Sequence, residues 1–205
     1  MTTLASLAES VDELLGSALH SKRLDLNELT LEVDSAEIKS ACIQLRDAPS
    51  CDFRQLTDLC GVDYSAYGLE NHESPDKPHL GVVYHLLSLN HNLRIRVRAM
   101  LDREQPMIDS VIGIWPCADW FEREAFDLYG IVFRGHPDLR RILTDYGFIG
   151  HPFRKDFPLS GHVEMAYDED KGRVAYRPVT VEDRILVPRT IREDTQTGRR
   201  QAETG

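Results

Sequence analysis

Two apolar runs separated by a short polar turn determine much of the architecture that this chain can adopt. The runs cover residues 80–89 and 93–101, with the turn at residues 90–92 between them. In the second run apolar side chains alternate with arginines, a period of two that is typical of a strand with one buried and one exposed face. The two runs predict an antiparallel hairpin whose exposed face carries Arg94, Arg96 and Arg98.

The chain before this hairpin predicts helices on either side of a strand. Apolar side chains recur at helical spacing in residues 4–15 and again in residues 38–45. Before the second of these segments, Asp34 and Glu37 have the spacing of a capping box, so Asp34 is the candidate N-cap. Between the two segments, the pattern of residues 24–33 indicates a strand.

The remaining patterns complete the predicted organisation. Apolar side chains at every third position over residues 53–59 predict a short third helix. The expected fold class is α+β, with an N-terminal α/β domain over residues 1–133 that has a mostly antiparallel sheet flanked by helices. An extended, largely irregular C-terminal arm that docks on a partner follows over residues 134–187. Residues 188–205 lack apolar periodicity and are expected to form a mobile tail.

Composition excludes two broad classes of protein. The 205 residues are 41% hydrophobic and 28% charged, and no apolar run approaches the roughly 18 residues that cross a bilayer. The sequence therefore predicts no transmembrane segment. The net charge of -10 argues against a general nucleic-acid binder, because such proteins carry a basic surface. The N-terminal residues have no basic stretch of the kind found in signal peptides, which favours a cytoplasmic protein.

The sequence predicts no catalytic, cofactor or metal site of its own. The four cysteines form no C-x-x-C pair, and no phosphate-binding loop, dinucleotide fingerprint, zinc-protease motif or nucleophile elbow is present. His136, His151 and His162 lie near several aspartates, but their spacing matches no common set of metal ligands. Free thiols in a reducing compartment are therefore expected.

Residues 120–130, WFEREAFDLYG, carry the most informative helix. Asp119 is placed to cap it, with Glu122 at the third position of a capping box. Glu122 falls within the apolar arc, where a carboxylate needs hydrogen bonds or an ion pair. A satisfied capping glutamate is favoured over a catalytic one. Arg123 and Asp127 are four residues apart on the opposite face and can pair there.

Residues 131–161 interleave basic and aromatic side chains, and the stretch from residue 134 is basic within an acidic protein. Gly-His-Pro occurs twice, and the prolines forbid a continuous helix, although Pro137 can open a short one through Ile142. Such a mixture can stack on single-stranded RNA, or it can anchor in a protein partner. The acidic net charge favours the partner.

Residues 122–143, EREAFDLYGIVFRGHPDLRRIL, closely resemble the signature of the family of the 30 kDa subunit of respiratory complex I. The resemblance continues through residues 145–165 and 174–179, and residues 53–64 also resemble the family. Phe153 stands where a leucine is commoner. The first 50 residues and the tail carry little of the resemblance.

The resemblance implies a non-catalytic structural and assembly subunit in the hydrophilic arm of proton-translocating NADH:quinone oxidoreductase. FMN and iron–sulfur clusters would reside in partner subunits, and the nearest partners would be the subunits that form the quinone pocket and hold the terminal cluster. The expected location is the cytoplasmic face of the bacterial cell membrane, as a peripheral protein. An equivalent subunit of a membrane-bound hydrogenase or of a ferredoxin- or plastoquinone-linked complex is the alternative, and an RNA-binding module is a remote one.

The candidate docking residues come from the signature helix and the segment after it. Aromatic members would anchor in a neighbour, and charged members would pair with it. The set is Glu122, Arg123, Glu124, Asp127, His136, Arg140, Arg141, Phe148, Phe153, Arg154, Lys155, Asp156, Phe157 and Pro158.

Overall fold

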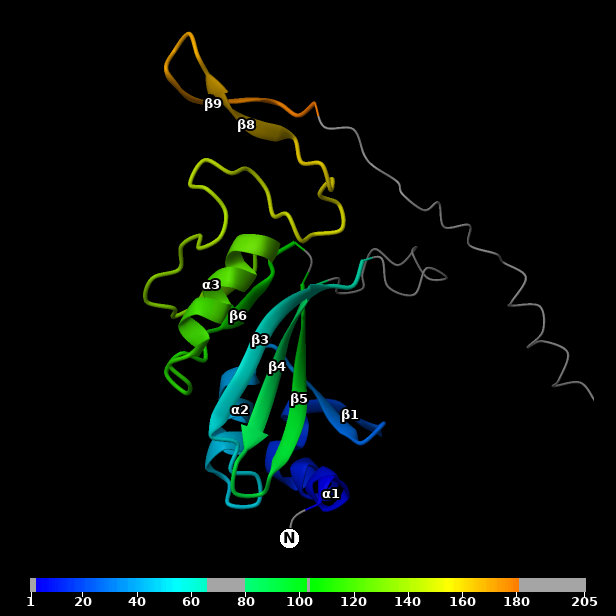
Figure 1. Ribbon diagram of the computed structural model, residues 1–205. Helices are drawn as coiled ribbons and strands as arrows, with labels where there is room; N and C mark the ends of the chain where they lie inside the picture. Colours follow the sequence, from blue (N-terminus) through cyan, green and yellow to red (C-terminus); the bar gives the residue numbers. More distant parts are fainter. Residues whose placement is uncertain (1–2, 66–79, 103, 181–205) are drawn as a thin grey trace, which may run out of the picture. The chain divides into compact units, whose positions relative to one another are not determined.

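The structure is a computed structural model that describes residues 3–65, 80–102 and 104–180 (Figure 1). The chain divides into two compact units, Met1–Pro158 and Leu159–Gly205. Residues 134–158, the first part of the predicted arm, therefore belong to the same unit as the sheet. The predicted tail at residues 188–205 lies outside the described residues. Among the described residues, no helix has the length and apolar character needed to cross a membrane.

The first unit is built on a five-stranded mixed sheet with the order β1-β2-β5-β4-β3. Only the β2–β5 pair is parallel, and the other three pairs are antiparallel. The α+β class with a mostly antiparallel sheet is thus confirmed. The strands are β1 (Leu19–Asp25), β2 (Glu28–Val33), β3 (Gln55–Asp63), β4 (Leu80–Ser88) and β5 (Leu93–Leu101).

Three α-helices contribute apolar side chains to the single core of this unit, with a 3₁₀ turn, η1 (Gly16–Ala18), between the first helix and the sheet. The Thr3 hydroxyl caps the first helix by accepting the Ser6 N–H at 3.2 Å. In β2, β4 and β5 alternate residues lie in the core, and the intervening residues face the other side of the sheet. No residue of β1 is buried. The helices are α1 (Leu4–Leu15), α2 (Ile38–Asp47) and α3 (Ala118–Tyr129).

The predicted hairpin of residues 80–101 is confirmed as β4 and β5, paired from Leu80–Leu101 to Ser88–Leu93. The strand predicted over residues 24–33 is only partly right, because the segment contains the end of β1, a turn and the whole of β2, which together belong to another hairpin. Its turn at Leu26 and Asn27 has positive φ at both positions, the geometry that matches the twist of a tight hairpin.

The third helix predicted over residues 53–59 is wrong, because this segment enters the strand β3. Leu56 and Leu59 are both buried although an uninterrupted strand would point them to opposite faces. A shift of register between Leu56 and Asp58 explains this: the extra residue of a β-bulge returns the apolar side chains to the same face. The bulge thus produces a three-residue spacing that imitates a helix.

Both predicted capping boxes are also wrong. The residue before α2 is Glu37, which makes no side-chain cap, and the Asp34 carboxylate instead accepts the N–H of Ala36. Helix α3 begins after Cys117, and Glu122 reaches a different part of the chain. The short helix predicted from Pro137 is absent, since residues 135–142 form turns and irregular backbone.

Two small sheets complete the fold. In the first unit, β6 (Met107–Asp109) and β7 (Val132–Arg134) pair in parallel on either side of α3 in the sequence. The second unit contains an antiparallel hairpin of β8 (Val163–Asp168) and β9 (Arg173–Pro178) within the stretch predicted to be largely irregular.

Candidate docking surface

Glu122 lies inside the protein, where its carboxylate holds the loop before α3. The side chain is fully buried, and it accepts hydrogen bonds from the Ser110 hydroxyl at 2.6 Å and the Val111 N–H at 2.7 Å. Burial raises the pKa of Glu122, although these two hydrogen bonds oppose the shift. The expectation that this carboxylate needs partners is met, and the carboxylate has no exposed surface.

Asp127 holds the segment after β7 against the side of α3. Its Oδ2 atom accepts three consecutive backbone N–H groups, from Ile142 at 3.0 Å and from Leu143 and Thr144 at 2.8 Å each. Its Oδ1 atom lies 2.9 Å from Arg141 Nη1 and also accepts the Thr144 hydroxyl. This fully buried carboxylate therefore fixes the backbone of residues 141–144.

The pKa of Asp127 reflects this environment. Burial raises the pKa, but hydrogen bonds from the Thr144 hydroxyl and the three backbone N–H groups outweigh it and lower the pKa to about 2. Asp127 is therefore a permanent anion at neutral pH.

Arg123 binds the same segment from a neighbouring position on α3. Its guanidinium donates to the carbonyl oxygens of Arg140 at 3.2 Å and Arg141 at 3.3 Å. The pair expected between Arg123 and Asp127 does not form, because both side chains bind the returning chain instead.

His136 is locked between α3 and the turn that follows β7. Its side chain is fully buried. The Asp138 N–H donates to its Nδ1 atom at 3.0 Å, so the ring proton resides on Nε2, which lies 3.2 Å from the carbonyl oxygen of Asp119. Arg140, by contrast, is exposed and pairs with Asp138 at 2.8 Å.

Residues 151–154 cap the C-terminal end of α3. The last carbonyl groups of a helix lack partners within the helix. Here three carbonyl oxygens at the end of α3 accept hydrogen bonds from the strap. Asp127 O accepts from His151 Nδ1 at 3.0 Å, and Leu128 O accepts from the Phe153 N–H at 3.1 Å. Tyr129 O accepts from Arg154 Nε at 2.6 Å. A cationic guanidinium at this end also complements the helix dipole.

Gly130 allows this close approach. It ends α3 with a φ of 73°, and a Cβ atom there would lie 2.5 Å from His151 Nε2 and 2.8 Å from an Arg154 nitrogen. The Lys155 N–H then donates to Asp63 Oδ2 at 2.8 Å, which ties the segment to the end of β3. The result is a folded strap rather than a free arm. We call residues 134–158 the strap.

The aromatic side chains of the strap differ in their exposure. Phe148 and Phe157 are half-buried, with their ring centroids 5.7 Å apart, and Arg141 lies 5.8 Å from the Phe148 centroid. Phe153 packs edge-on against Tyr129 at 5.8 Å and is still 54% exposed. The predicted anchors Phe148 and Phe157 therefore contact each other, and Phe153 presents the most surface.

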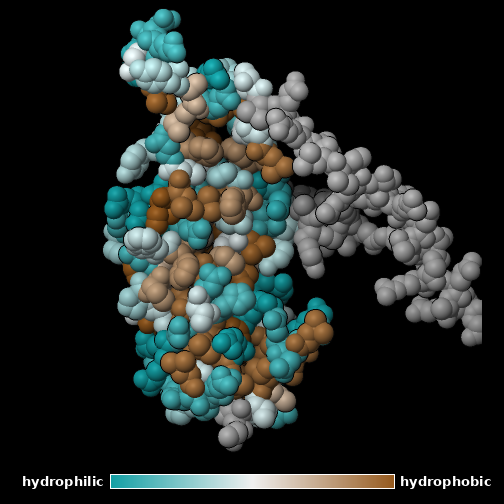
Figure 2. Space-filling model, in the orientation of Figure 1, coloured by the Kyte–Doolittle hydropathy of each residue, from teal (hydrophilic) through white to brown (hydrophobic). Residues whose placement is uncertain are grey.

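The strap also exposes apolar side chains that are not in the predicted docking set. Leu143, Tyr146 and Ile149 are 64%, 85% and 86% exposed. We call these three side chains together with Phe153 the strap patch. On the face of the molecule that Figure 2 shows, hydrophobic surface is interspersed with hydrophilic surface. The available signal was the sequence LTDYGFIG itself, which places apolar residues where no periodicity directs them to a core.

The remaining candidate residues do not converge on one point. Glu124, Lys155 and Asp156 are exposed, and Pro158 is half-buried. The candidate side chains that the structure brings together are thus the buried ones. By fixing the backbone of the strap, they hold the strap patch in place.

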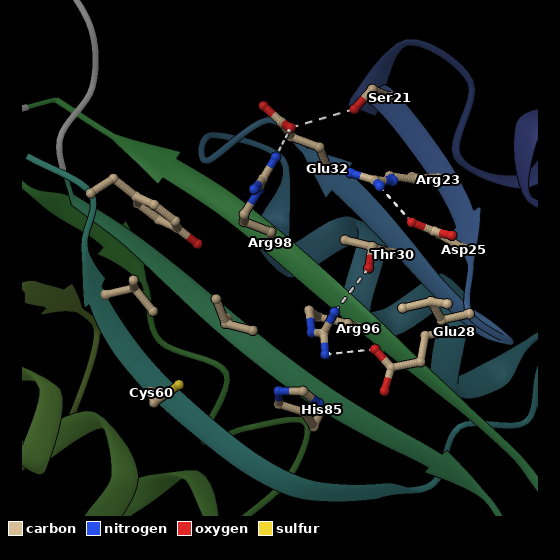
Figure 3. A pocket seen from close by; sticks show the side chains of 14 residues that line it. Ser21, Arg23, Asp25, Glu28, Thr30, Glu32, Cys60, His85, Arg96 and Arg98 are labelled. Atoms are coloured by element: carbon tan, nitrogen blue, oxygen red, sulfur yellow. Dashed lines mark hydrogen bonds and ion pairs between the residues drawn. The ribbon is translucent and has the colours of Figure 1, made fainter. Parts of the chain in front are cut away.

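A hollow lies on the face of the five-stranded sheet opposite the helices (Figure 3). Its volume is about 600 Å³, and β1, β2, β5, β4 and β3 all contribute to its lining. Within it, Arg96 pairs with Glu28 at 2.9 Å and Arg98 with Glu32 at 2.5 Å. Of the three arginines predicted on the exposed face, Arg96 and Arg98 are therefore neutralised by carboxylates of β2.

Two observations concern the chemistry of the side chains at these surfaces. Among the described residues, no three His, Cys, Asp or Glu side chains are placed to hold a metal ion. Burial raises the pKa of the Cys60 thiol, which lines the hollow, so this thiol is not an activated nucleophile.

Comparison with known proteins gives one consistent result. Residues 31–163 match the family model described as the 30 kDa subunit of respiratory-chain NADH dehydrogenase. The chain is 56% identical over 190 residues to an NADH-quinone oxidoreductase subunit of Acidithiobacillus ferrooxidans strain ATCC 53993, covering 93% of each chain. It is 57% identical over 194 residues to the corresponding protein of Thiobacillus denitrificans, covering 94% of this chain and 96% of that one.

A solved structure shows the same fold. The structure of a trypsin-resistant fragment of Nqo5 is 29% identical, with a TM-score of 0.52. The match covers 65% of this chain and 98% of the fragment.

Proposed function

The chain belongs to the family of the 30 kDa subunit of respiratory-chain NADH dehydrogenase, and from this membership we propose that it is a structural subunit without a catalytic centre of its own. In this proposal, FMN and iron–sulfur clusters in other subunits carry electrons from NADH to quinone. The whole complex couples that transfer to proton translocation. The buried carboxylates support the proposal, because Glu122 and Asp127 are occupied by hydrogen bonds that hold the chain's own loops.

The observation that carries the proposal is the strap patch. Exposed apolar side chains that gather on one surface mark protein interaction sites, especially where a rigid scaffold presents them. The four side chains of the strap patch fall within residues 143–153 and are each more than half exposed. The capping of α3 and the Asp127 hydrogen bonds supply that scaffold. We assign the patch to contact with the subunits that form the quinone pocket and hold the terminal cluster.

The same proposal gives the location of the protein. A subunit that binds partners in the hydrophilic arm is held at the cytoplasmic face of the bacterial cell membrane by those partners. The described residues contain no helix that could cross the membrane, and a peripheral subunit needs none.

Replacing Leu143 and Ile149 together by serine tests the patch. Both side chains are exposed, so the isolated chain should keep its stability, whereas incorporation into the complex should fall by about tenfold or more as interface anchors are lost. Leu89→Ser is a matched control, because Leu89 is 69% exposed in the turn between β4 and β5. Normal incorporation of the double variant would contradict the assignment of the patch.

The relatives favour NADH:quinone oxidoreductase over a hydrogenase or a ferredoxin-linked complex, since both of the bacterial proteins match at more than half identity over nearly the whole chain. The arginines of the strap that could bind RNA phosphates already bind groups of this chain. Arg141 and Arg154 bind Asp127 and Tyr129, and Arg140 pairs with Asp138. No salt-dependent binding to single-stranded RNA is therefore expected.

A further inference from the structure

His151 occupies a confined position at the C-terminal end of α3. Its ring is half-buried, and its Nδ1 atom donates a hydrogen bond to the carbonyl oxygen of Asp127 at 3.0 Å. The ring proton therefore resides on Nδ1, and Nε2 carries the lone pair that can accept a second proton. In the part of the chain that the structure describes, Nε2 has no hydrogen-bond partner. It lies over Gly130, 2.5 Å from the point where a Cβ atom of that residue would stand.

Two guanidinium groups stand beside this nitrogen. A nitrogen of Arg154 lies 2.8 Å from the same Cβ position on Gly130, so it is a close neighbour of His151 Nε2. Arg154 is fixed there because its Nε atom donates to the last carbonyl group of α3 at 2.6 Å. Arg141 is held nearby because it donates at 3.1 Å to the carbonyl oxygen of Gly150, the residue before His151. A proton on Nε2 thus brings a third positive charge to a site that already holds two.

The negative groups near the ring already have partners. The Asp127 carboxylate, which faces His151 from α3, accepts the Arg141 guanidinium and three backbone N–H groups. The carbonyl oxygens that end α3 are occupied as well, by the Phe153 N–H, by Arg154 and by His151 Nδ1 itself. Burial lowers the pKa of His151, and the two guanidinium groups lower it further, against the opposing effect of Asp127. The folded chain therefore favours the neutral ring.

We propose that His151 is a pH-sensitive clasp, which holds the strap to the end of α3 when its ring is neutral and releases the strap when its ring is protonated. In this step the Nε2 lone pair takes a proton from the solvent, and the charged ring is repelled by Arg154 and Arg141. Residues 151–154 then leave α3, and with them Phe153, whose N–H and ring both contact the helix.

The clasp bears on the strap patch, because the patch lies between two attachments to α3. The Asp127 hydrogen bonds fix residues 141–144, and the clasp fixes residues 151–154. When the clasp opens, Tyr146, Ile149 and Phe153 are held at one end only. The consequence that fewer chains present a fixed patch to a partner in acid rests on the proposed function, whereas the clasp itself does not.

The direction of the pH dependence follows from the preference for the neutral ring. Because the pKa of His151 is lower in the attached strap than in the released one, the clasp is at full strength above the ordinary histidine value of about 6.5 and weakens as the pH falls below it. Asp127, with a pKa of about 2, stays charged throughout this range. The strap therefore loosens in mild acid while its other attachment persists.

Replacing His151 by asparagine tests the clasp. The asparagine amide can donate to the Asp127 carbonyl in place of Nδ1, but it takes up no proton. Amide hydrogen exchange of the full chain, corrected for the intrinsic effect of pH, reports on the N–H groups of Phe153 and Lys155 at pH about 7.5 and about 5.5. In the wild type their protection should fall severalfold at the lower pH, whereas in His151→Asn it should be equal at both.

His20→Asn is the matched control, because it removes an exposed histidine of β1 and should keep the pH dependence of the wild type. Amides of β4 and β5 should keep their protection at both pH values, since the clasp opens locally. A pH dependence that survives in His151→Asn would assign the effect to another group, such as the buried His136, and would overturn the proposal. An equal loss of protection in β4 and β5 would overturn it as well.

An NMR titration of the His151 ring in the wild type gives a test that does not depend on the variant. Its midpoint should lie below that of the same ring in the chain unfolded in urea. An equal or higher midpoint would overturn the proposal, because the folded chain would then not favour the neutral ring.

Incorporation of the purified full chain into membranes that lack it tests the link to docking. The exchange data give the fraction of released strap at each pH, and incorporation of the wild type relative to His151→Asn should fall by that fraction. A ratio that does not follow the released fraction would contradict the link to docking. If neither protein enters an NADH:quinone oxidoreductase at any pH, the proposed function is wrong, and the exchange experiment still decides the clasp.

Discussion

Replacing Asp127 by asparagine should release residues 141–144 from α3 while the five-stranded sheet stays folded. The carboxylate is fully buried and accepts the backbone N–H groups of Ile142, Leu143 and Thr144 as well as a guanidinium N–H of Arg141. An asparagine keeps one carbonyl oxygen but presents an NH₂ group to donors on its other side. The change therefore removes the charge and leaves donors facing a donor.

The magnitude follows from the pKa of Asp127. A pKa lowered to about 2, against an ordinary value near 4, corresponds to about 2 kcal/mol of stabilisation of the charged form. The mismatched amide adds roughly 1 kcal/mol. A total of about 3 kcal/mol increases the population of the open strap by roughly a hundredfold.

Amide hydrogen exchange measures this opening directly. In the Asp127→Asn variant, the amides of Ile142, Leu143 and Thr144 should exchange roughly a hundredfold faster, while amides of β4 and β5 keep their protection. Asp138→Asn is the control, because it removes an exposed carboxylate that pairs with an exposed arginine. Unchanged exchange at residues 142–144 would refute the role assigned to Asp127.

The pH dependence has a definite sign. Because the pKa of Asp127 is lower in the folded chain than in the unfolded one, its stabilisation is complete above pH about 4 and disappears as the pH falls through about 2. The wild-type strap should therefore open over this pH range. In the Asp127→Asn variant, the opening of the strap should not change with pH for this reason.

Two further predictions concern the attachment of α3. Gly61→Ala should lower the melting temperature, since the new Cβ atom would lie 2.6 Å from Tyr129 Cδ2 and displace α3 at a cost of about 1–3 kcal/mol. Glu122→Ala should lower the free energy of unfolding in urea by about 3 kcal/mol, because the buried Ser110 hydroxyl and a backbone N–H lose their acceptor.

Matched controls separate these effects from a general sensitivity of the fold to substitution near α3. Gly113→Ala adds a Cβ atom that would meet no atom within 4 Å. Glu124→Ala removes an exposed carboxylate two residues from Glu122. Neither control should change the melting temperature measurably, and a loss equal to that of its partner variant would contradict the contacts proposed for Gly61 or Glu122.

Local patterns predicted the elements whose periodicity is uninterrupted. Helix α1 and the β4–β5 hairpin follow directly from apolar spacing. The spacing failed at β3, because the bulge between Leu56 and Asp58 changes the phase of a strand by one residue. A bulge depends on the partner strand, so the segment alone gives no sign of it.

The contacts of the strap were beyond local patterns for a similar reason. The sequence indicated that Glu122 needed partners, but Ser110 lies before the helix and outside any capping box. Asp127 and Arg123 had the spacing of a helical pair, yet each binds a segment that returns more than a dozen residues later. Sequence spacing cannot distinguish a pair within a helix from two anchors for a returning chain.

The family signature acquires a physical meaning from these contacts. Arg123, Asp127 and His136 bind the chain's own backbone rather than facing solvent. Their role as contacts to a partner stays a prediction. In our proposal their function is to position the strap patch for contact with the partner.

Affinity purification of the tagged chain from mildly solubilised membranes tests the central claim most directly, with the NADH:quinone oxidoreductase activity of the eluate as the readout. We predict that the chain co-purifies with the flavin and iron–sulfur subunits and with inhibitor-sensitive activity, and that the Leu143→Ser, Ile149→Ser double variant recovers about a tenth of both. A chain that is recovered alone, or with hydrogenase subunits and no NADH oxidation, would contradict it.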